Sequence, residues 1–148
     1  MIPVLDSRGM RGADAEAIRR GADSEDLMES AAEALRRDLR SAWPDARRIV
    51  VVCGPGKNGG DGLAVARLLA LEGASPSVFT LKDPALYARE SAANAQRASG
   101  VGLILTSLGR PGGHAALRRA LADGDVVIDA LFGGAGKYHT RIEGRDFS

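Results

Sequence analysis

Apolar residues recur along this chain at two different spacings. In residues 10–20 and again in 24–39 they recur every three or four positions, which predicts two amphipathic helices. From residue 49 to 53 the chain instead carries an uninterrupted apolar run, Ile-Val-Val-Val-Cys, rich in β-branched side chains. A strand that is apolar on both faces is typical of the centre of a parallel sheet covered by helices on both sides.

The remainder of the chain alternates predicted helices and strands. Further strands are predicted at residues 77–81, 101–105 and 125–129, and helices at 63–72, 85–99 and 114–122. Four strands separated by three helices predict an α/β fold with a Rossmann-like, doubly wound parallel sheet, preceded by the two N-terminal helices. Ligands of such sheets bind at the carboxyl ends of the strands, so we expect the site there.

Composition narrows the functional classes. The chain has 148 residues, of which 45% are hydrophobic and 26% charged, as expected for one soluble globular domain. Its 20 basic and 19 acidic residues leave a net charge of +1, which argues against a nucleic acid or an anionic membrane as partner. We expect a cytoplasmic location, since no apolar run approaches the roughly 20 residues of a membrane span and no signal-peptide pattern is present. The one cysteine, Cys53, excludes a disulfide framework.

Glycine is the compositional feature that points to a site. The chain has 19 glycines, and they cluster at residues 54–62 and 133–136, directly after the first and the last predicted strand. Clustered glycines allow the backbone to approach a ligand closely. We therefore expect both glycine-rich segments to face one pocket.

The first glycine cluster contains the spacing G-x-G-x-x-G at Gly54, Gly56 and Gly59, between a predicted strand and a predicted helix. This spacing favours a dinucleotide-binding dehydrogenase, which would also need an acidic residue after the second strand, such as Asp83. Asp61, however, would place a carboxylate at the predicted helix start, where it disfavours a pyrophosphate. Asp61 is equally suited to be the N-cap of that helix. Asn58, for its part, suits a left-handed turn.

Three segments in order resemble one known family. Residues 52–67 resemble the signature loop of the YjeF N-terminal domain, the NAD(P)H-hydrate epimerases. Residues 10–29 are similar to the opening pattern of that family, and residues 129–136 to its second glycine-rich loop. The resemblance covers residues 1–148 as one such domain, incomplete at its C-terminus and lacking the final strands.

The resemblance implies an isomerase of nicotinamide nucleotide repair. Members interconvert the R and S forms of hydrated NADH or NADPH, bind one potassium ion and usually form homodimers. A fused or separate ADP- or ATP-dependent dehydratase then acts on the S form. By position, Asn58 and Asp129 would be the potassium ligands. The substrate-binding residues would be Lys57, Asn58, Gly59, Gly60, Asp61, Gly133, Gly134, Ala135, Gly136, Lys137, Tyr138 and His139.

Two departures from the family pattern keep an alternative open. Lys57 stands where the family usually has asparagine, which places a cation close to the potassium site or against the phosphates of the substrate. The family's later Asp-x-Pro-Ser-Gly segment, which carries an aspartate close to the reacting ring, does not occur before Ser148. The alternative is a catalytically impaired fragment that acts as a nucleotide-binding or partner-binding module, and the resemblance alone assigns no catalytic residue here.

Overall fold

The computed structural model describes residues 4–6 and 24–131, with side chains for all of these except residues 4–6, 24, 25, 57 and 58. The elements, in chain order, are β1 (Val4–Asp6), α2 (Ser24–Ala42), β2 (Ile49–Cys53), α3 (Lys57–Leu71), β3 (Ser77–Thr80), the 3₁₀ helix η1 (Pro84–Leu86), α4 (Arg89–Gly100), β4 (Leu105–Ser107), α5 (Gly113–Asp123) and β5 (Val126–Ala130). The helix predicted for residues 10–20 lies outside the described part of the chain.

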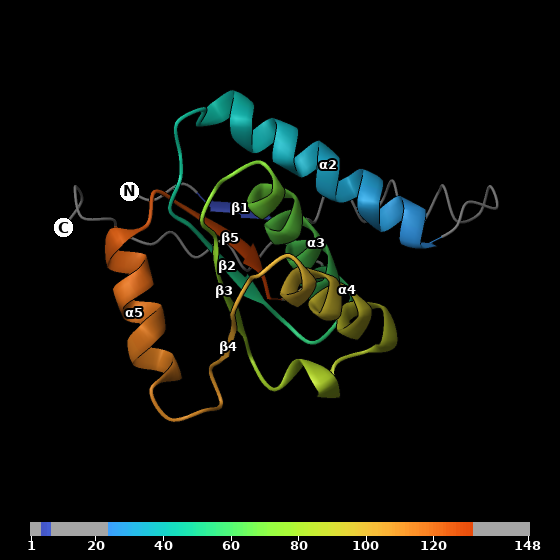
Figure 1. The fold of residues 1–148 in the computed structure, drawn as a ribbon, viewed down its shortest axis with the longest axis vertical. Helices are drawn as coiled ribbons and strands as arrows, with labels where there is room; N and C mark the ends of the chain where they lie inside the picture. The colour runs from blue at the N-terminus through green and yellow to red at the C-terminus, as the bar shows by residue number, and fades with distance from the viewer. Residues whose placement is uncertain (1–3, 7–23, 132–148) are drawn as a thin grey trace.

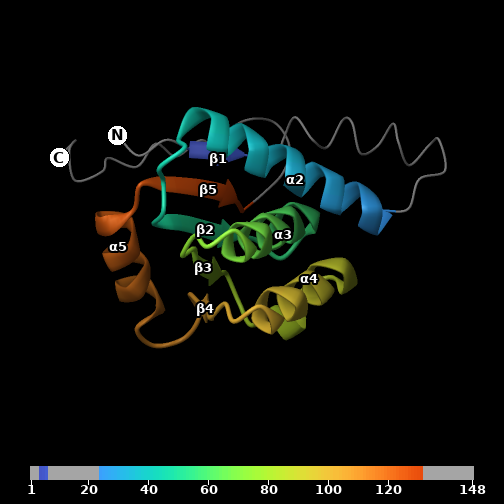
Figure 2. The ribbon, with the colours of Figure 1, turned by 45° about the horizontal axis from the view of Figure 1, so that its top comes forward.

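The described strands form one parallel sheet in the order β1-β5-β2-β3-β4 (Figure 2). The predicted doubly wound α/β class is therefore confirmed. The prediction of four strands was too low, because β1 at Val4–Asp6 pairs with β5 and adds a fifth. A three-residue strand is too short to show a periodicity, so the sequence pattern did not reveal it.

Helices cover the sheet unequally. Helices α2, α3 and α4 lie on one face, whereas α5 is the only described helix on the other (Figure 1). All residues of β2 are buried, and their side chains alternate between the two faces of the sheet. Ile49 and Val51 pack with α2, α3 and α4, while Val50 and Val52 pack against α5. The predicted two-sided burial of this strand is confirmed.

Helix α2 has the predicted apolar stripe on one side and charges on the other. Its buried residues are Met28, Ala31, Ala32, Leu35 and Leu39. On the outer side, Arg36 and Arg40 both donate to the Glu72 carboxylate at the end of α3. Arg67 of α3 also forms an ion pair with Glu29 of α2. None of the helices in the described part of the chain combines the length and the apolar character that a membrane span needs.

The strand predicted at 101–105 lies further along the chain, at Leu105–Ser107. The preceding residues end α4 instead. Gly102 has a left-handed backbone with φ +94°. The Leu103 amide donates to the Ala98 carbonyl at 3.2 Å and the Gly102 amide to the Ser99 carbonyl at 3.0 Å. This pair of hydrogen bonds is a Schellman motif. It includes apolar residues that the sequence pattern predicts to be in a strand.

Candidate functional site at the carboxyl edge of the sheet

The strands β2 and β5 end side by side, and the chain leaving each of them remains in contact. The Gly54 amide donates to the Ala130 carbonyl at 2.9 Å. A Cβ atom on Gly54 would lie 1.8 Å from the Leu131 carbonyl oxygen, so only glycine fits there. The first glycine cluster and the segment leading toward the second therefore meet at one edge of the sheet. Residues 133–136 lie outside the described part of the chain, so a common pocket for the two clusters stays a prediction.

Helix α3 begins at Lys57, six residues before the predicted start. Its N-cap is Gly56, which makes no side-chain capping hydrogen bond. The interpretation of Asp61 as the N-cap is therefore wrong, and so is that of Asn58 as a left-handed turn residue. Asp61 lies in the second turn of α3 and is 1% exposed. The argument that a carboxylate stands at the helix start, and so disfavours a phosphate there, no longer applies.

Glycines in the first two turns of α3 let the helix approach its neighbours more closely than other residues would allow. A Cβ on Gly59 would lie 1.7 Å from the Gly54 carbonyl oxygen, and one on Gly62 would lie 2.6 Å from the Ala130 Cβ. Gly60 faces the opposite way, where its Cβ would lie 3.0 Å from both the Met28 methyl group and the Ser91 hydroxyl. Tight packing thus accounts for the glycines inside the helix.

Asp129 lies at the carboxyl end of β5, beside the turn that leads into α3. Its side chain is 6% exposed, and its Oδ1 atom accepts a hydrogen bond from the Leu131 amide at 3.1 Å. The backbone of Asp129 pairs in register with Val52 on one side and with Asp6 on the other. A carboxylate is one of the oxygen ligands that hard cations take. No group of three His, Cys, Asp or Glu residues that could hold a metal ion occurs among the residues described.

A small cavity of about 190 Å³ opens beside Asp129 on the α5 face of the sheet. Its walls are aliphatic apart from this carboxylate, and the lining residues are Val52, Leu81, Leu108, Leu117, Leu121, Val127, Asp129 and Leu131. A wider groove of about 940 Å³ lies at the other end of the strands, where it is lined by residues that precede β3 and β4. The wider groove does not include any residue predicted for the site.

Tyr87 and Ser91, near the start of α4, contact the glycine-rich turn and were missed by the sequence analysis. The Tyr87 hydroxyl donates to the Cys53 carbonyl at 2.7 Å and accepts from the Leu81 amide at 2.9 Å. The Ser91 hydroxyl donates to the Gly56 carbonyl at 2.7 Å. Polar residues at buried positions of a helix were the available signal, since Ser91 and Asn94 lie in line with the buried alanines of α4.

Burial shifts the pKa of two side chains that adjoin the turn between β2 and α3, Cys53 and Tyr87. It raises the pKa of the Cys53 thiol far above its ordinary value. It also raises the pKa of the Tyr87 hydroxyl, although hydrogen bonds with the backbone act in the opposite direction. Cys53 is fully buried in the core, which favours a packing role for this thiol over a reactive one.

The remaining predicted site residues fall into two groups. Lys57 and Asn58 are the first residues of α3, and their side chains lie outside the described part. Gly133, Gly134, Ala135, Gly136, Lys137, Tyr138 and His139 also lie outside the described residues. Asp83, required by the dehydrogenase alternative, uses its carboxylate to accept from the Ala85 amide at 3.0 Å and thereby caps η1.

Comparison with known proteins decides the family. The model of a family described as the YjeF-related protein N-terminus matches residues 24–144. The chain belongs to this family. The match spans the described elements from α2 to β5, and with them both glycine-rich segments.

Relatives of this family member include enzymes of two kinds. A protein of Rhodobacter capsulatus named NAD(P)H-hydrate epimerase is 34% identical over 141 residues, which are 90% of this chain and 63% of the relative. One of Limosilactobacillus fermentum with the same name is 38% identical over 84% of this chain and 56% of the relative. A bifunctional NAD(P)H-hydrate repair enzyme of Coxiella burnetii is 33% identical over 90% of this chain and 26% of its own length.

The chain thus spans less than two thirds of these curated relatives. A solved structure shares the fold: the crystal structure of yeast ynu0, YNL200c, superposes with a TM-score of 0.70 at 24% identity. The superposition covers 95% of this chain and 60% of the yeast chain. The Rossmann-like architecture derived from the sequence is therefore found in an experimental structure as well.

Proposed function

We propose that this chain carries the substrate site of an NAD(P)H-hydrate epimerase, an isomerase that interconverts the R and S forms of hydrated NADH or NADPH. The observation that carries the proposal is the contact between the turn before α3 and the chain leaving β5, through the Gly54 amide and the Ala130 carbonyl. It joins two of the three segments on which the family resemblance rests. The curated relatives that carry the epimerase name support the same reaction.

In this proposal the start of α3 receives the phosphates of the substrate. The first N–H groups of a helix have no partner within the helix, and together with the helix dipole they attract anions. Gly59, Gly60 and Asp61 would line the substrate on this side, with Lys57 and Asn58. Residues 133–139 would line it on the other side.

We also propose that Asn58 and Asp129 hold a potassium ion. The support is chemical: Asp129 supplies one buried carboxylate, and Asn58 belongs to the first turn of α3, which follows the neighbouring strand β2. A bound potassium ion would supply positive charge beside the phosphates of the substrate. Lys57 would add a second positive charge there.

A dehydratase that uses ADP or ATP, fused or separate, would be the functional partner. The support is that several relatives are named as bifunctional repair enzymes. The homodimer and the cytoplasmic location expected from the sequence stay predictions.

The test is a coupled assay with the purified chain and the pure R form of NADPH hydrate. A dehydratase that accepts only the S form provides the readout. We expect S hydrate to form faster than by spontaneous epimerisation, and Asp61→Asn to lower that rate, whereas Asp45→Asn, at an exposed residue after α2, leaves it unchanged. A rate equal to the spontaneous one would refute the epimerase proposal, and saturable binding of the hydrate without turnover would favour the binding module.

A further inference from the structure

The turn between β2 and α3, residues 54–56, is held by a short segment that follows β3. Each end of this turn accepts a hydrogen bond from a buried side chain: Cys53, just before it, from the Tyr87 hydroxyl, and Gly56 from the Ser91 hydroxyl. Between them, the Pro55 carbonyl accepts from the Ala88 amide at 3.4 Å. One stretch of five residues, 87–91, thus holds three carbonyl groups of four consecutive residues.

The two hydroxyl donors and the Cys53 carbonyl are buried, whereas Gly56 lies at the exposed end of the turn. Tyr87 is 6% exposed and Ser91 is 0% exposed. A buried hydroxyl that loses its acceptor, or a buried carbonyl such as that of Cys53 that loses its donor, is costly. The hydroxyl groups therefore fix the orientation of the peptides in the turn.

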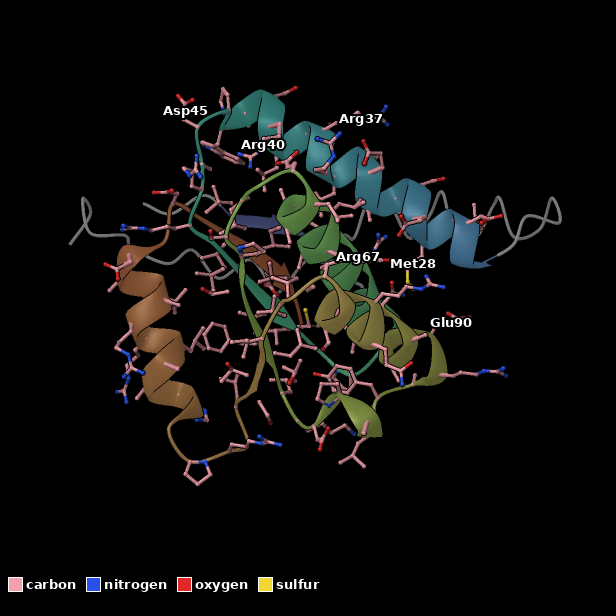
Figure 3. The ribbon with its side chains drawn as sticks, in the orientation of Figure 1. Met28, Arg37, Arg40, Asp45, Arg67 and Glu90 are labelled. Carbon is pink, nitrogen blue, oxygen red and sulfur yellow. The ribbon has the colours of Figure 1, made fainter. Side chains whose placement is uncertain are left out.

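The orientation of these peptides decides where α3 begins. The Gly56 carbonyl that accepts from Ser91 also accepts from the Gly59 amide at 3.1 Å and the Gly60 amide at 3.4 Å, which are the first hydrogen bonds of the helix. Gly60 lies against Ser91 and against Met28 of α2, whose sulfur is seen between α2 and α4 in Figure 3. The first turn of α3 is consequently fixed by side chains from two other helices.

Neither hydroxyl is needed by α4 itself. The N-cap of α4 is Ala88, which makes no side-chain capping hydrogen bond, and both Tyr87 and Ser91 donate to another segment. We propose that Tyr87 and Ser91 are positioning residues, which hold the start of α3 in the orientation that receives the substrate. The expected effect on turnover rests on the proposed function, whereas the expected effect on the turn is measured in the free chain without substrate.

The experiment compares Tyr87→Phe and Ser91→Ala with a matched control, Ser107→Ala. Ser107 is also buried, and its hydroxyl accepts from the Gly109 amide at 3.2 Å, at the end of β4 and not at the turn. Hydrogen exchange of the Gly59, Gly60 and Leu81 amides is measured in the free chain. kcat and KM for the R form of NADPH hydrate, together with Tm, are then measured for each variant.

We expect exchange at Gly59 and Gly60 to rise roughly fivefold in Ser91→Ala, with no change in Ser107→Ala. In Tyr87→Phe we expect a smaller rise at Leu81, because its amide also donates to the Cys53 carbonyl at 3.3 Å. We expect KM to rise by about tenfold in both variants while kcat changes less, at a loss of Tm similar to that of the control. Unchanged exchange at the Gly59, Gly60 and Leu81 amides overturns the proposal, and so does a KM equal to that of the control. If the unsubstituted chain has no activity, the proposed function fails, and the exchange data alone decide whether the two residues hold the turn.

Discussion

Two helices begin at the same edge of the sheet, and their starts differ. Both α3 and α5 follow a strand, and both have a glycine N-cap, Gly56 and Gly112, without a side-chain capping hydrogen bond. From the sequence alone, either start is a candidate for binding an anion. The difference lies in what surrounds them.

The start of α3 is enclosed by segments from elsewhere in the chain, whereas the start of α5 packs against the residues just before it. The turn before α3 is bonded to the end of β5 and to Tyr87 and Ser91. Before α5, Gly112 has a left-handed backbone with φ +84°, the Gly113 amide donates to the Arg110 carbonyl at 3.0 Å, and a Cβ on Gly113 would meet the Ser107 carbonyl. The comparison teaches that a glycine-rich helix start becomes a candidate site when several elements converge on it, and that the glycines by themselves do not suffice.

The largest expected effect is that of Gly59→Ala at the enclosed start. The added Cβ would lie 1.7 Å from the Gly54 carbonyl oxygen, so the backbone must move. We expect the free energy of unfolding to fall by at least about 3 kcal/mol. The control is Gly100→Ala, at the last residue of α4, where a Cβ meets no atom within 4 Å. It should change stability by less than about 1 kcal/mol, in the stabilising direction. Equal effects of the two substitutions in urea unfolding would contradict the packing described for α3.

The second prediction concerns the start of α5. Gly113→Ala would place a Cβ 2.4 Å from the Ser107 carbonyl oxygen, and we expect a loss of about 2 kcal/mol in the free energy of unfolding. Binding of NADPH hydrate, measured by calorimetry at a temperature where the variant is folded, should be unchanged. A loss of binding in the folded variant would mean that the start of α5 belongs to the site.

A third prediction tests the cation beside α3. Asp129→Asn keeps the shape of the side chain but removes its charge, so we expect the affinity for potassium to fall by at least about tenfold. The measurement is the rise of Tm with potassium chloride relative to lithium chloride. The control is Asp45→Asn, which changes an exposed residue at the opposite end of the sheet. If the unsubstituted chain responds equally to both salts, the proposed potassium site is wrong.

The smallest effect concerns Cys53, from which the enclosed turn leaves β2. Burial holds the pKa of this thiol above its ordinary value of 9.0 in the folded chain, so only the unfolded chain loses the proton near pH 9. The stability due to the buried neutral thiol is therefore complete below pH 9 and is lost as the pH rises above it. Between pH 8 and pH 10 we expect the free energy of unfolding to fall by about 1 kcal/mol more in the unsubstituted chain than in Cys53→Ala, as measured by urea unfolding at each pH. Identical pH profiles would show that the thiol does not contribute.

Much of the fold could be predicted because the apolar patterns were strong. The run at β2, the stripe of α2 and the strand at β5 lie within a few residues of where the sequence predicts them, since an uninterrupted apolar run and a helical spacing are both clear signals. The strand at 101–105 was displaced because Gly102 ends α4 with a left-handed residue, and that use of apolar residues has no periodic signature.

The start of α3 at the carboxyl edge of the sheet was predictable in its location and not in its local structure. Glycine has a low helix propensity, so residues 57–62 were interpreted as a loop, although they form the first turns of α3. The close approach of Gly62 to Ala130 depends on segments far apart in the sequence, and this tertiary packing outweighs local propensity. The contacts of Tyr87 and Ser91 are equally non-local, which is why no spacing rule found them.

The most direct test of the site at the start of α3 is a titration of the ¹⁵N-labelled chain with the R form of NADPH hydrate, followed by NMR. We expect the largest amide shifts at residues 54–62, with those at 109–113 unchanged. Shifts centred on residues 109–113, or no shifts at saturating hydrate, would contradict the assignment of the site to the enclosed helix start.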